Sequence, residues 1–175
     1  MRKGLVTLLG AFLLVGASAG SARADTLFES DIVGKVVGGQ EIATPAGLME
    51  IGAPWVVASG KVEIQSTGRL EADVSGLLLT GAPAPGTVGP VLTVFASLVC
   101  QKTVLTGAPT NEVVASTTDV PLSAAGDAKI DEIITLPSVC VAPIVLIRVK
   151  LADLGGGPFD IAAGGFTAWI AASGF

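Results

Sequence analysis

The sequence predicts an all-β protein, an antiparallel sandwich of two sheets with about eight strands in an immunoglobulin-like or jelly-roll topology. Three observations support this fold class. Apolar and polar residues alternate with a period of two over most of the chain, as in strands that bury one face. The spacing of an amphipathic helix is missing after the N-terminal segment. Residues that favour turns separate the alternating stretches at intervals typical of a sandwich.

The first 24 residues are expected to be a cleavable signal peptide. Arg2 and Lys3 precede an apolar run over residues 5–16, which is too short to span a bilayer. The small residues Ala22 and Ala24 are suited to cleavage after position 24. Residues 25–175 would then form one secreted domain, in the periplasm, at the cell surface or outside the cell. An uncleaved N-terminal anchor is the alternative.

Charge limits the partners of this domain. The full chain has 10 Lys and Arg residues and 15 Asp and Glu residues, a net charge of −5. Arg2, Lys3 and Arg23 leave with the signal peptide, so the mature domain carries −8. Nucleic acids and anionic lipids require clustered Lys and Arg residues, which this chain lacks. We expect no nucleic-acid partner and no membrane span after cleavage; a protein or a cell-envelope component fits better.

The clearest expected unit is a hairpin of strands at 56–65 and 69–74. Val62 and Ile64 alternate with charged or polar residues in the first strand, and Leu70 and Val74 do so in the second. Residues 66–68 supply the turn. Six further strands are expected at 31–37, 91–100, 112–118, 129–136, 143–151 and 166–172. The run 91–100 is almost continuously apolar, so both of its faces should be covered.

Cys100 and Cys140 are the only cysteines. In an exported protein such a pair most simply forms a disulfide. This bond would close a loop of roughly 40 residues and stabilise the fold by about 4 kcal/mol. Metal ligation is the alternative, but two thiols without any His do not complete a usual zinc site.

Catalytic residues are not expected, because the chain has no His and no Tyr. Ser–His and Cys–His nucleophiles and His-ligated metals are therefore excluded. Ser59 and Lys61 share a strand face, but that face reads as solvated, whereas a lysine base must be buried. The acidic pairs Glu71 with Asp73 and Asp131 with Glu132 resemble those of glycosidases only in residue type. We expect neither an enzyme nor a cofactor.

Two pairs of residues are candidates for binding a ligand. Asp153 and Asp160 enclose a Gly-rich loop that could ligate Ca²⁺ through carboxylates and carbonyls, although the EF-hand spacing is absent and turn formation explains the same residues. Trp55 and Trp169 could form a binding platform, although tryptophan in a sandwich more often packs in the core.

Residues 60–64 and 68–77 resemble a strand pair of many secreted bacterial β-proteins and are similar to part of the CHRD domain. Residues 96–100 and 136–140, which each end in a cysteine, resemble a family of uncharacterised exported bacterial proteins in which two such cysteines recur. The resemblance covers about half of the mature chain. It implies an immunoglobulin-like sandwich with a poorly defined extracellular role, and it does not indicate any particular activity. The His-containing features of CHRD domains are missing, which puts any role tied to them in doubt.

The sequence therefore predicts a secreted, non-catalytic binding or structural module of the cell envelope or the extracellular space. One alternative is a calcium-dependent carbohydrate-binding domain or a carboxylate-dependent hydrolase. Another is a self-assembling pilin-like or surface-layer subunit. Such a subunit completes its sheet with a strand from a neighbour, so it predicts an incomplete sheet and an apolar groove.

Overall fold

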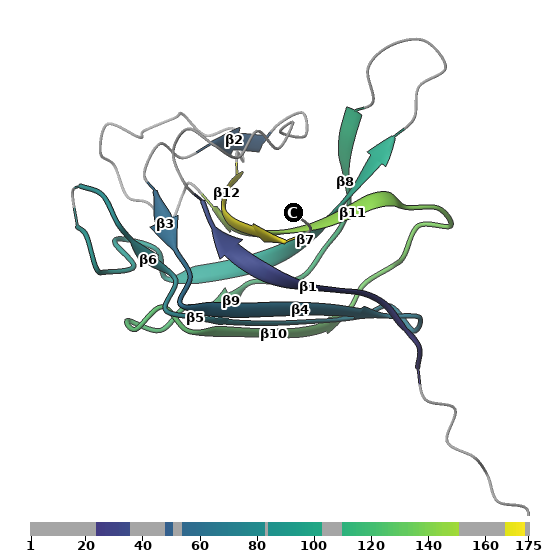
Figure 1. Ribbon diagram of the computed structural model, residues 1–175, viewed down its shortest axis with the longest axis horizontal. Coiled ribbons are helices and arrows are strands. Elements are labelled where there is room, and N and C mark those ends of the chain that lie inside the picture. The colour runs from purple at the N-terminus through teal and green to yellow at the C-terminus, as the bar shows by residue number, and fades with distance from the viewer. Residues whose placement is uncertain are drawn as a thin grey trace, which may run out of the picture.

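The computed structural model describes residues 24–35, 48–50, 54–82, 84–102, 110–150 and 167–173. All regular elements among them are strands (Figure 1). These are β1 (Thr26–Gly34), β2 (Leu48–Glu50), β3 (Trp55–Val56), β4 (Ser59–Gln65), β5 (Arg69–Ser75), β6 (Leu78–Leu79), β7 (Thr93–Lys102), β8 (Thr110–Ser116), β9 (Val120–Pro121), β10 (Ala128–Ile133), β11 (Val141–Lys150) and β12 (Thr167–Ser173). No helix in these ranges is long and apolar enough to cross a membrane.

Ten strands form one large sheet, which curls on itself like half of a barrel (Figure 1). Eight of them follow one another in the order β10-β5-β4-β1-β12-β11-β7-β8. Their pairings are antiparallel, whereas the short β2 adds to β12 in parallel. The short β9 pairs with β7, and β3 and β6 form a separate two-stranded sheet.

Strand β1 joins the two halves of the curled sheet. Its first part, from Thr26 to Asp31, pairs with β4. Its last part, from Ile32 to Gly34, pairs with β12. The sequence predicts a sandwich of two sheets. The described residues form one large curled sheet, because β1 passes through both of its halves, and the small sheet of β3 and β6.

The curl encloses one hydrophobic core, to which both halves contribute buried side chains. Val62, Leu70 and Ile130 come from the first half, and Val145 and Ile147 come from the second. Successive residues of a strand point to opposite faces, so the second half can also bury its outer side. A second cluster lies there, made of Val99, Leu146, Trp169 and Ala172. The expectation that the run 91–100 has two covered faces is confirmed from Val94 onward.

The hairpin of β4 and β5 is confirmed. Val62 lies opposite Ala72, and Ile64 lies opposite Leu70, all with buried side chains. The turn between the strands places Gly68 at a φ of 86°, a left-handed conformation that glycine adopts at low cost. Alternation of period two therefore determines which residues this hairpin places in the core.

All eight predicted strands are present, with ends that differ by a few residues. The first predicted strand, 31–37, instead begins at Thr26 and ends at Gly34. Its early part pairs with β4, and Phe28 packs against the core. Four strands of two or three residues, β2, β3, β6 and β9, were not expected. Such short elements carry too few residues to show a periodic pattern.

The predicted disulfide is confirmed. Cys100 in β7 is bonded to Cys140, and their Cα atoms are 5.1 Å apart. Cys140 comes directly before β11, whose first residue, Val141, lies opposite Gln101. The bond therefore fastens the start of β11 to its neighbour β7, and it occupies both thiols that the metal alternative required.

Candidate binding site

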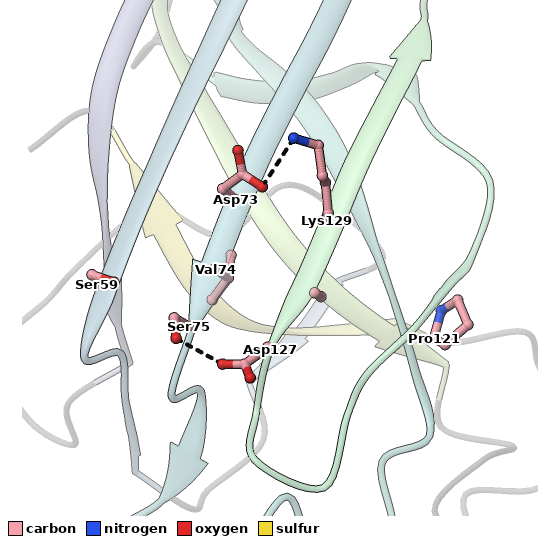
Figure 2. A pocket seen from close by; sticks show the side chains of 8 residues that line it. Ser59, Asp73, Val74, Ser75, Pro121, Asp127 and Lys129 are labelled. Atoms are coloured by element: carbon pink, nitrogen blue, oxygen red, sulfur yellow. Dashed lines mark hydrogen bonds and ion pairs between the residues drawn. The ribbon is translucent and has the colours of Figure 1, made fainter.

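A polar hollow of about 350 Å³ lies over the adjacent strands β4, β5 and β10 (Figure 2). It is lined by Ser59, Asp73, Val74, Ser75, Pro121, Asp127, Ala128 and Lys129. Figure 2 shows two polar contacts across its floor, one between Asp73 and Lys129 and one between Ser75 and Asp127.

The carboxylate of Asp127 holds a turn. It accepts hydrogen bonds from the Ser75 hydroxyl at 2.7 Å and from the Gly76 N–H at 3.1 Å. These bonds, led by the one from Ser75, lower the pKa of Asp127, so the group is ionised at neutral pH. An ionised carboxylate that is already an acceptor for two donors is a poor general acid. We assign Asp127 the structural task of joining the start of β10 to the end of β5.

Several of the other polar residues that the sequence singled out form ion pairs. Lys61 forms an ion pair with Glu29 on β1, and a hydrogen bond to that carboxylate raises the pKa of Lys61. A lysine base needs a lowered pKa, so Lys61 stays protonated at neutral pH and cannot accept the proton of Ser59. Glu71 lies 2.8 Å from Arg69, which also binds Asp131. No group of three or more acidic, His or Cys residues suited to a metal occurs in the described ranges.

An apolar hollow of about 250 Å³ opens beside the disulfide. It is lined by Leu27, Phe28, Ile64, Leu98, Leu136, Pro137, Ser138, Cys140 and Pro143. The lining comes from β1, β4, β7 and β11 and from the segment that links β10 to β11. Ser138 is the only lining residue with a polar side chain.

Exposed apolar side chains accompany this hollow. Leu27, in its wall, is 60% exposed, and the residues on either side of Cys140, Val139 and Val141, are 74% and 45% exposed. An apolar hollow with such neighbours is a common mark of a contact surface. The disulfide holds this segment in place, since Cys140 is both a lining residue and half of the bond. The sequence showed each of these residues singly, but nothing in it indicated that they would meet.

Both candidate tryptophans are in the core. Trp55 is 4% exposed and belongs to the main cluster, and Trp169 is fully buried in the second cluster. The ammonium group of Lys35 lies 5.1 Å from the centroid of the Trp169 ring, a cation–π distance. These surroundings match the alternative that the tryptophans pack in the core, while a ligand-binding role for them stays a prediction. Asp153 and Asp160 lie outside the described residues.

A buried arginine, which the sequence analysis did not single out, lies on the outer face of the second half. Arg148 is 7% exposed, donates from Nη1 to the Ser97 hydroxyl at 2.8 Å and lies 5.0 Å from the centroid of the Phe95 ring. Burial lowers the pKa of its guanidinium. Ser97 also bonds to Ser116, at 2.8 Å. Arg148 therefore ties β11 to β7 and, through Ser97, to β8.

No protein-family model, curated protein or solved structure matches this chain. The similarity to CHRD domains and to exported bacterial proteins therefore stays a prediction.

Proposed function

We propose that this protein is an exported, non-catalytic binding or structural module, and that the apolar hollow beside the disulfide is its contact surface. The observation that carries this proposal is the combination of an apolar hollow with three exposed apolar side chains, Leu27, Val139 and Val141. Contact with an apolar group of a partner would remove these side chains from water, at roughly 25 cal/mol per Å² of buried apolar surface.

The compartment and the architecture belong to the same proposal. A disulfide is compatible with an oxidising compartment, as expected after export. The two halves of the curled sheet share one core, which favours an immunoglobulin-like sandwich as the closest description of the domain. A role without catalysis is favoured because charged groups that could act as a base, an acid or an anion-binding group already have partners. Lys61 and Arg69 form ion pairs, and Asp127 holds a turn.

Export is tested by expressing the full chain in a bacterium and measuring the intact mass of the product outside the cytoplasm. The expected product begins at Asp25 and carries the bond between Cys100 and Cys140. A chain that stays in the cytoplasm, or that keeps residues 1–24, would overturn this part of the proposal.

Binding at the hollow is tested with the neutral fluorescent probe N-phenyl-1-naphthylamine. The variant Leu27→Ser/Val139→Ser should bind it about tenfold more weakly, because it removes an apolar side chain that lines the hollow and an exposed one next to the lining residue Cys140. Leu92→Ser is the control, since Leu92 is also exposed but neither lines the hollow nor adjoins a lining residue in sequence. Equal losses in both variants, or no binding by the parent protein, would contradict the assignment of the contact surface.

A further inference from the structure

One continuous segment, residues 135–143, forms most of the wall of the apolar hollow. We call this segment the strap. It follows β10 and includes the first residues of β11. It supplies five of the nine residues that line the hollow, namely Leu136, Pro137, Ser138, Cys140 and Pro143. A strap that moved away would therefore leave the hollow without most of its wall.

Few non-covalent bonds hold the strap in place. Directly before it, the N–H of Ile134 donates to the carbonyl oxygen of Gly68 at 2.9 Å. Within the described ranges, no backbone hydrogen bond outside the sheets involves residues 135–140. Leu136 packs against the core but is only half-buried. The disulfide at Cys140 is therefore the firmest attachment of the strap to the sheet.

The strap enters β11 through a strained bulge. The register of β11 against β7 shifts there, so that Ala142 and Pro143 together stand against the single residue Cys100. Ala142 has a φ of 44°, a left-handed conformation that is costly for alanine, and a residue before proline favours an extended backbone instead. Strain of this kind persists only where the surroundings hold it. The disulfide supplies such a hold, because it joins Cys100 to Cys140, two residues before Ala142.

The two sulfur atoms differ in how a reagent can reach them. Cys100 is 4% exposed and belongs to the main core cluster. Cys140 is half-buried and lines the hollow. An attacking thiolate therefore meets the bond at Cys140, on the side of the hollow.

We propose that the bond between Cys100 and Cys140 is a redox latch, which a dithiol opens to release the strap and dismantle the hollow. The inference rests on the proposed function and adds control of the contact surface. A thiolate of the dithiol attacks Sγ of Cys140 and forms a mixed disulfide, while the sulfur of Cys100 leaves with the electron pair and takes up a proton. The second thiol of the dithiol then displaces Cys140. The protein thereby gains two thiols, and the dithiol is oxidised to a disulfide.

Opening of the latch is tested by the binding of N-phenyl-1-naphthylamine to the oxidised protein and to the protein reduced with dithiothreitol. Reduction should weaken binding at least about tenfold, because the strap no longer lines the hollow. Far-ultraviolet circular dichroism should stay that of the folded protein. Unchanged affinity in the reduced, folded protein would refute the latch and leave the proposed contact surface standing. Loss of the circular dichroism signal on reduction would also overturn the latch, because the release would not be local.

The strain at Ala142 gives a second test, which needs no probe. Glycine adopts a φ of 44° at low cost, so Ala142→Gly should favour the held strap over the released one. Half reduction should then need about a fivefold higher ratio of reduced to oxidised dithiothreitol than in the parent protein. Alkylation of free thiols followed by mass spectrometry measures the reduced fraction.

Ala125→Gly is the matched control for this substitution. Ala125 is also an exposed alanine, but it has no positive φ and lies outside the strap. Its replacement should leave the reduction equilibrium unchanged. Equal shifts in Ala142→Gly and Ala125→Gly, or no shift in either, would show that reduction does not release the strap and would overturn the proposal.

Occupation of the hollow and reduction of the bond should oppose each other, since a filled hollow needs the strap in place. With the probe at about three times its dissociation constant, half reduction should need about a fourfold higher dithiothreitol ratio. Absence of this shift in a protein that binds the probe would contradict the latch. A parent protein that binds no probe would refute the proposed contact surface, whereas Ala142→Gly would still decide whether reduction releases the strap.

Discussion

Arg69 and Asp131 form the best-defined ion pair of the described surface. The Arg69 Nε donates to Oδ1 of Asp131 at 2.8 Å, and its Nη2 donates to Oδ2 at 2.6 Å. The hydrogen bond to the guanidinium holds the pKa of Asp131 below its usual value. Because the folded pKa is lowered, this pair stabilises the fold while the carboxylate is ionised. That contribution is lost as the pH falls through the folded pKa.

Asp131→Asn should therefore lower the melting temperature at neutral pH by a modest amount, since an exposed pair contributes little. The difference from the parent protein should disappear below about pH 2, where both proteins are uncharged at this position. Thermal unfolding followed by circular dichroism over a series of pH values measures this difference in melting temperature. A difference that persisted in acid would show that charge is not the cause.

Gly126 and Gly86 allow two effects of a glycine to be separated. Both have a positive φ, 83° and 77°. A Cβ on Gly126 would lie 2.5 Å from the backbone N of Leu77, whereas a Cβ on Gly86 would meet nothing within 4 Å. Gly86→Ala should lower the free energy of unfolding by about 1 kcal/mol, because only the unfavourable backbone conformation of alanine contributes. Gly126→Ala should lower the free energy of unfolding by about 3 kcal/mol, because the backbone at Leu77 must also move to make room for the Cβ. Urea unfolding measures both, and equal costs would contradict the steric account.

Individual residues were predictable from the sequence only where chemistry leaves few choices. Two cysteines allow one intramolecular bond, so the pairing of Cys100 with Cys140 followed directly. The apolar hollow did not follow, because its lining joins segments near positions 28, 64, 98 and 136–143. No local pattern specifies that such distant segments meet.

At the scale of elements, alternation of period two located all eight main strands. It fails where an element is shorter than the pattern, as in β3, β6 and β9, which have two residues each. Strand ends were less predictable than strand centres. They depend on the partner strand, as the pairing of the early part of β1 with β4 shows.

The disulfide between β7 and the start of β11 is the main covalent constraint on the elements. Its partners are 40 residues apart in sequence. Cys100→Ala/Cys140→Ala should lower the free energy of unfolding by about 4 kcal/mol, largely because the unfolded chain regains freedom. Urea unfolding of the variant and of the reduced parent protein should agree. A loss below about 1 kcal/mol would contradict the loop-closure account.

At the scale of the molecule, the curl of the sheet was beyond sequence reasoning. The sequence indicates which residues are apolar, but not that β1 leaves β4 at Asp31 and joins β12 at Ile32. That change of partner depends on the twist of the whole sheet.

The shared core and the shared strand predict a single cooperative unfolding transition. Trp55 and Trp169 report on separate hydrophobic clusters. The single-tryptophan variants Trp55→Phe and Trp169→Phe should therefore each show a fluorescence transition that coincides with loss of far-ultraviolet circular dichroism. Two separated midpoints within one variant would show that the halves unfold independently.

The pairing of Ile32 with Ser173 also orders events during synthesis. Strand β1 can pair with β12 only after all the strands that lie between them in the sequence have been synthesised. Until then β1 has β4 alone, and the core stays open along one side. The two halves of the core can therefore close over one another only once β12 is available to pair with β1.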